Sequence, residues 1–80
     1  MIVKVLIPNV GMGTDEGTIS RWLKREGDRV TEGETLVELE FAKAMQDVPA
    51  PATGILIRIL LHEGHTAPVH TEIALIEAGA

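Results

Sequence analysis

The 80-residue chain has no cysteine and no tyrosine, and it has only one tryptophan and one phenylalanine. The lack of cysteine excludes a disulfide framework, thiolate zinc and iron–sulfur sites, and a cysteine nucleophile. The chain has seven Lys and Arg and twelve Asp and Glu, which gives a net charge of −5. A negative charge and so few aromatic residues make nucleic-acid binding unfavourable. The same charge disfavours anionic membrane surfaces, and no apolar run approaches the roughly 20 residues of a membrane span. We therefore expect a soluble cytoplasmic protein, or a domain of one, that binds neither nucleic acid nor membrane.

The hydrophobic content is 45%, and it comes almost wholly from aliphatic residues. This content and this length predict one small globular domain near the lower size limit for a self-sufficient core. The N-terminal run up to Pro8 lacks the basic region and cleavage site of a signal peptide. Small residues at positions 77–80 have the character of a linker start, so we expect a domain excised from the N-terminal end of a longer chain.

Short apolar runs alternate with glycine-bearing polar turns, and this spacing predicts an all-β fold, a flattened barrel or sandwich. No segment sustains a helical period without an interrupting glycine or proline. Residues 35–41 alternate with a period of two, which predicts Leu36 on the face of Glu38 and Val37 on the opposite face. Strands are predicted over residues 2–7, 18–23, 35–41, 44–48, 55–61 and 72–77.

An internal repeat organises the chain. When residues 17–40 are compared with residues 54–77, a shift of 37 positions, apolar positions largely correspond and both copies contain a Glu-Gly turn. The repeat predicts two half-units that pack face to face as small, mostly antiparallel sheets with pseudo-two-fold symmetry. It also predicts that Trp22 and its counterpart Ile59 are buried in a shared core. Six pairs are identical: Gly17/Gly54, Arg21/Arg58, Leu23/Leu60, Glu26/Glu63, Gly27/Gly64 and Glu40/Glu77.

One lysine lies between the two half-units. The segment from Glu40 to Met45 contains neither glycine nor proline, yet the chain must reverse there if the halves are to pair. Lys43 is near the middle of this reversal, between Ala42 and Ala44. An isolated lysine at a hairpin tip between small residues is sterically open to another enzyme. Lys4 and Lys24 fall on predicted strands and are interpreted as ordinary surface lysines.

These residues resemble the modification site of lipoyl domains, the carriers of 2-oxo acid dehydrogenase complexes. The similarity at the site consists of Lys43-Ala44 followed by Asp47-Val48 and Ala50-Pro51. Further motifs follow the family pattern in order along nearly the whole chain. They are Pro8 with Gly11, Glu16-Gly17, Trp22-Leu23, Glu26-Gly27-Asp28, Gly33-Glu34, Gly54, Glu63-Gly64 and Pro68-Val69.

The resemblance implies a non-catalytic carrier domain whose parent chain is a dihydrolipoamide acyltransferase. Lipoate joined by an amide to Lys43 would form a swinging arm that moves acyl groups and reducing equivalents. The implied partners are a lipoate ligase or lipoyl transferase, a thiamine-diphosphate-dependent 2-oxo acid decarboxylase, the acyltransferase core and a flavin-containing dihydrolipoamide dehydrogenase. The domain itself is expected to be monomeric, and the segment from Lys43 to Pro51 most resembles the pyruvate type.

Two alternatives share the predicted fold. Biotin carriers use the same lysine position but normally have Met on both sides of it, where this chain has Ala42 and Ala44, with Met45 one place further on. The lipoyl pattern usually has Asp before the lysine, where this chain has Ala42, and a small polar residue where it has Phe41. An unmodified interaction domain with a degenerate lysine site is therefore the second alternative.

Other candidate residues are interpreted structurally. His62, His65 and His70 match no metal-binding signature and are expected to be solvated turn residues. The acids Glu38 and Glu40 alternate with core residues as an exposed strand face does, and we do not interpret them as an acid–base pair. The glycines of the Gly11–Gly13 loop lack the following Lys-Ser/Thr of a phosphate-binding loop, which favours a conformational role. We predict no catalytic residue and no metal ligand.

Overall fold

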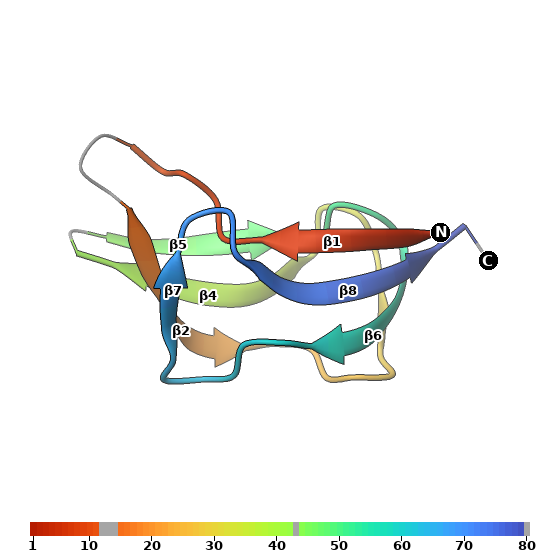
Figure 1. The fold of residues 1–80 in the computed structure, drawn as a ribbon. Coiled ribbons are helices and arrows are strands. Elements are labelled where there is room, and N and C mark those ends of the chain that lie inside the picture. The colour runs from red at the N-terminus through yellow and green to blue at the C-terminus, as the bar shows by residue number, and fades with distance from the viewer. Residues whose placement is uncertain (12–14, 43, 80) are drawn as a thin grey trace.

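The computed structural model describes residues 1–11, 15–42 and 44–79, and in these ranges the chain forms eight β-strands. They make two antiparallel four-stranded sheets, as the all-β prediction required, and the described ranges contain no helix that could span a bilayer. Figure 1 shows the two sheets facing each other. The strands are β1 (Ile2–Leu6), β2 (Glu16–Trp22), β3 (Arg29–Val30), β4 (Thr35–Phe41), β5 (Ala44–Pro49), β6 (Gly54–Ile59), β7 (Thr66–Pro68) and β8 (Glu72–Ala78).

The two sheets are equivalent by a pseudo-two-fold operation. One has the order β1-β8-β6-β3 and the other β5-β4-β2-β7. A shift of 37 positions carries the ranges of β2, β3 and β4 onto those of β6, β7 and β8, apart from one-residue differences at the ends. The spatial order of the sheets therefore matches the repeat seen in the sequence.

The core lies between the sheets and is almost entirely aliphatic. Alternate strand residues point inward because successive side chains of a strand face opposite sides. The largest fully buried side chains come from both sheets and belong to one cluster, so the two sheets share a single core. They are Val5, Ile7, Ile19, Val30, Leu36, Val37, Leu39, Leu56, Ile73 and Ile76.

Reciprocal hydrogen bonds from the two Glu-Gly turns join the halves. The Gly27 N–H donates to the carbonyl of Leu56 (2.7 Å), and the Gly64 N–H donates to the carbonyl of Ile19 (2.8 Å). The preceding glutamates act in the same crossed way. The Trp22 N–H donates to Oε2 of Glu63 (2.9 Å), and the Ile59 N–H donates to Oε2 of Glu26 (2.8 Å). Each turn thus satisfies backbone groups at the end of a strand in the other half.

The two chain ends and the β4–β5 hairpin occupy equivalent positions at opposite ends of a molecule 38 Å long. At one end Phe41 pairs with Ala44, so only residues 42 and 43 connect β4 to β5. At the other end the Ala78 N–H donates to the carbonyl of Met1 (2.8 Å), beside the β1–β8 pairing. Figure 1 shows the N and C labels at the end away from this hairpin.

Three details differ from the predicted elements. The short strands β3 and β7 were not predicted, because two or three residues carry no periodicity and pair only through tertiary contact. Leu36 is buried together with Val37, although alternation placed them on opposite faces, because the β4–β5 register shifts between Thr35 and Val37. Trp22 and Ile59 are only partly buried against the core rather than within it.

Candidate functional site

Lys43, the predicted modification site, lies outside the described residues, but the residues on both sides of it are described. Strand β4 ends at Phe41 and β5 begins at Ala44, and these two residues face each other in the antiparallel ladder. A two-residue connection is the commonest way to close such a hairpin. Ala42 and Ala44 are both exposed and carry only methyl side chains. The backbone beside position 43 is therefore not shielded by its neighbours.

An aromatic side chain closes the core beneath this hairpin. Phe41, the last residue of β4, is buried with 6% of its surface exposed. Its ring covers Gly17 of β2, where a Cβ atom would stand 2.8 Å from Cε1 of the ring. Since β2 begins at Glu16, the β1–β2 connection enters the sheet at this same end. The end of β4 and the start of β2 are thus neighbours.

The outer face of the two hairpin strands is acidic. Glu38 and Glu40 point away from the buried side of β4, and their register partners on β5 are Asp47 and Met45. Arg21 of β2 is paired in register with Glu38. The prediction of an exposed acidic strand face is confirmed at Glu40, which is exposed, whereas Glu38 is partly covered.

The other two lysines of the chain are each engaged with a carboxylate. Nζ of Lys4 lies 3.2 Å from Glu72, and Nζ of Lys24 lies 2.9 Å from Glu34. The prediction that Lys24 lies on a strand is wrong. Strand β2 ends at Trp22, and the chain then bends into the first Glu-Gly turn, so Lys24 lies after the strand. Neither lysine belongs to the β4–β5 hairpin.

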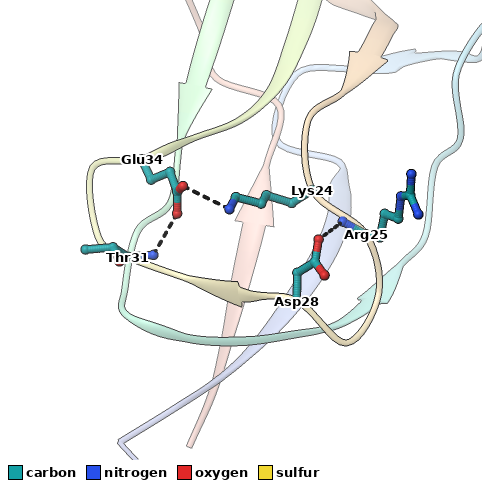
Figure 2. A network of polar contacts seen from close by, with 5 residues as sticks. All are labelled: Lys24, Arg25, Asp28, Thr31 and Glu34. Carbon is teal, nitrogen blue, oxygen red and sulfur yellow. Dashed lines mark hydrogen bonds and ion pairs between the residues drawn. The ribbon is translucent and has the colours of Figure 1, made fainter.

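The contact of Lys24 belongs to a small polar network drawn in Figure 2. Glu34 accepts from Lys24 and also from the backbone N–H of Thr31 (3.0 Å). The Lys24 hydrogen bond, with that of Thr31, lowers the pKa of the Glu34 carboxyl from its ordinary value. Asp28 accepts from the backbone N–H of Arg25 (2.9 Å) within the adjoining turn. The network fixes the connection between β2 and β4.

The remaining candidates lie in turns. His62, His65 and His70 are exposed, as expected for solvated turn residues. His70 has a positive φ of 71° and stands where the first half-unit has Gly33, whose φ is 89°. Within residues 1–11, 15–42 and 44–79, no three His, Asp or Glu side chains gather as metal ligands. Of the Gly11–Gly13 loop, Met12 and Gly13 lie outside the described residues.

Trp22 has a polar partner as well as a packing role. Its ring packs against the core, and its Nε1–H donates to the carbonyl of Leu61 (2.9 Å). Trp22 and Ile59 line an open concavity that is flanked by the two turns. The ring therefore joins the end of β2 to the connection that follows β6.

Two features of this architecture were missed in the sequence. The repeat pointed to the matched Glu-Gly turns, but the crossed hydrogen bonds of Glu26 and Glu63 required the tertiary arrangement. The contact of Phe41 with Gly17 was only weakly indicated by the sequence, which has an aromatic residue and a glycine 24 positions apart on two predicted strands. The pairing of β2 with β4 brings these two residues together.

Several known proteins are similar to this chain in sequence. Residues 3–76 match the Biotin_lipoyl family model, described as "Biotin-requiring enzyme". The chain is 38% identical over its full length to the dihydrolipoyllysine-residue succinyltransferase component of the 2-oxoglutarate dehydrogenase complex of Bartonella vinsonii subsp. berkhoffii, and spans 20% of that protein. It is 42% identical over 95% of its length to the corresponding acetyltransferase component of the pyruvate dehydrogenase complex of Mycobacterium bovis, and spans 14% of it.

A solved structure gives the same result for the fold. The lipoyl domain of the 2-oxoglutarate dehydrogenase complex from Azotobacter vinelandii superposes with a TM-score of 0.72 at 28% identity. The alignment covers 94% of this chain and 99% of that domain. The chain therefore belongs to the biotin/lipoyl family and has the two-sheet fold of a lipoyl domain.

Proposed function

We propose that this domain is a lipoyl carrier and that lipoate is joined through an amide to the side chain of Lys43. The observation that carries the proposal is the two-residue connection between Phe41 and Ala44, which brackets Lys43 in sequence between two paired strands. The exposed methyl side chains of Ala42 and Ala44 fit the group, because they leave the backbone there open to a modifying enzyme.

The contacts of the other lysines support the same choice. Lys4 is paired with Glu72 and Lys24 with Glu34, so each ammonium group has an acidic partner. Both residues also lie away from the hairpin, on β1 and after β2.

The domain would contribute presentation rather than catalysis. Bound lipoate supplies the dithiolane chemistry of acyl and electron transfer, and the protein supplies binding and orientation. The β4–β5 hairpin, held by its ladder and by Phe41, would present the modified lysine at one end of a rigid body. Tethering raises the effective concentration of a carried group at each partner site.

The relatives suggest the setting. They are acyltransferase components of both pyruvate and 2-oxoglutarate dehydrogenase complexes, and the chain spans a fifth or less of their length. We propose a parent acyltransferase chain with the decarboxylase, the acyltransferase core and dihydrolipoamide dehydrogenase as partners in the cytoplasm. Between the two named complexes we favour the pyruvate type, on the segment from Lys43 to Pro51.

A biotin carrier is the second candidate, since the matching family includes biotin-dependent proteins. Ala42 and Ala44 stand where biotin carriers normally have Met, which favours lipoate. The third candidate is an unmodified interaction domain, for which the replacement of the usual Asp by Ala42 is the motivating feature.

Incubation with lipoate, ATP and a lipoate ligase tests the proposal. Intact mass should show one added lipoyl group, and peptide mapping should locate it at Lys43. Lys43→Arg is the matched control, because it keeps the charge and lacks an acylatable amine, and it should gain no mass. Modification at Lys4 or Lys24, or undiminished modification of Lys43→Arg, would contradict the assignment. A biotinyl group on the protein from its native host would favour the second candidate.

A further inference from the structure

The two ends of the molecule are built from equivalent rows of residues, but only one row contains an aromatic ring. At the hairpin end the row runs Ala44, Phe41, Gly17 and Ala67 across β5, β4, β2 and β7. At the chain ends the equivalent row runs from Met1, which precedes β1, through Ala78 of β8 and Gly54 of β6 to Val30 of β3. Phe41 thus stands where the other half-unit has Ala78.

The ring is the only large side chain in its row. Gly17 is buried, and a Cβ atom there would meet Cε1, Cζ and Cδ1 of Phe41 at 2.8, 3.1 and 3.3 Å. Real Cβ atoms do not approach a neighbour as closely as 2.8 Å, so the ring can lie this close to β2 only because position 17 is a glycine. A cross-strand aromatic covering a glycine stabilises the pairing of its two strands.

The contact joins the end of β4 to the start of β2. Phe41 is the last residue of β4 and lies two positions before Lys43, whereas Gly17 is the second residue of β2. Without the ring, this row would contain only Ala and Gly side chains, which offer little apolar surface to bury.

We propose that Phe41 is a positioning residue for the modification of Lys43: seated on Gly17, its ring fixes the end of β4 and so the hairpin that a modifying enzyme must recognise. The inference rests on the proposed function. It adds a specific role for a side chain that is buried and cannot touch the enzyme itself. Correct placement of a reacting group depends on such supporting contacts.

The test compares Phe41→Ala with Val30→Ala. Val30 is the matched control because it is fully buried, belongs to the equivalent row and lies at the far end of the molecule. At a temperature where circular dichroism shows both variants fully folded, Phe41→Ala should reduce kcat/KM for lipoylation at least tenfold. Val30→Ala should change it less than twofold, and Phe41→Leu should restore it to within threefold of the parent.

Amide hydrogen exchange provides a readout that needs no ligase. Phe41→Ala should speed exchange at residues 44–46 at least tenfold more than at Ile76. Val30→Ala should not speed exchange at residues 44–46 more than at Ile76. Parent-like lipoylation and exchange in Phe41→Ala, or an equal loss of lipoylation in Val30→Ala, would overturn the proposal. If the parent chain gains no lipoyl group, the proposed function fails and exchange alone decides the role of Phe41. If Phe41→Ala does not fold, Gly17→Ala, which displaces the ring, replaces it in both measurements.

Discussion

The hairpin end and the chain-terminus end of this domain occupy equivalent places in a pseudo-symmetric fold, yet they are closed by different means. At the hairpin end a phenylalanine ring covers Gly17. At the other end no ring is present, and the backbone of β8 comes so close to Gly54 that a Cβ atom there would overlap the carbonyl of Glu77. One end is therefore sealed by a movable side chain and the other by backbone. The comparison shows that the two half-units have a glycine at the same repeat position for different reasons: Gly17 makes room for a ring, and Gly54 makes room for backbone.

The two glycines should respond very differently to the same substitution. Gly54→Ala should cost about 3 kcal/mol of unfolding free energy, because relief of the overlap requires the backbone of β6 or β8 to move. Gly17→Ala should cost about 1 kcal/mol, because the Phe41 ring can rotate away. Urea denaturation of both variants measures the difference. Equal costs would show that the two ends are closed alike.

The Glu-Gly turns are where the halves should prove equal. Glu26→Ala removes the acceptor of the Ile59 N–H, and Glu63→Ala removes that of the Trp22 N–H. Each change should cost about 1 kcal/mol, the usual net value of one hydrogen bond. The exposed Glu32 provides a control, since Glu32→Ala should change stability little. If urea denaturation gave very different losses of unfolding free energy for Glu26→Ala and Glu63→Ala, the two turns would not be energetically equivalent.

A smaller effect should come from the Lys24–Glu34 pair, which the second half lacks because Leu61 and Thr71 stand in the equivalent positions. The pKa of Glu34 is lowered in the folded protein, so the pair stabilises the fold above the ordinary glutamate pKa of about 4.3. That contribution should disappear as the pH falls through the lowered folded value. Lys24→Leu should flatten this acid limb of the stability curve in pH-dependent urea denaturation. If Lys24→Leu left the acid part of the stability curve unchanged, the loss of stability at low pH would arise from other carboxylates.

The smallest expected effect concerns Ala42 at the hairpin. If shape and backbone govern recognition, Ala42→Asp should change the rate of lipoylation less than threefold, because the β4–β5 ladder already defines the reversal. The rate of reductive acylation by a cognate decarboxylase should change equally little. A tenfold rise, which corresponds to about 1.4 kcal/mol of transition-state stabilisation, would show that a partner reads the aspartate directly.

Much of the fold could be predicted from particular residues. Alternation in residues 35–41 and the glycine-bearing turns predicted β4 and its neighbours, and the 37-residue shift predicted the equivalence of β2 with β6 and of β4 with β8. Lys43 was singled out by its place between the half-units and by the family resemblance, and its modification stays a prediction. The strands β3 and β7 were missed because their few residues have no pattern without their partners.

The sequence by itself determined the all-β class, the repeat and the family, because periodicity, turn glycines and motif order are local properties of the chain. Only the tertiary structure decided which half each Glu-Gly turn supports, and that Trp22 lies at the edge of the core while Leu36 lies inside it. It also decided that Phe41 rests on Gly17. The physical reason is that these contacts join residues far apart in the chain, and their partners are set by strand register and by crossing between the halves, which no local pattern contains.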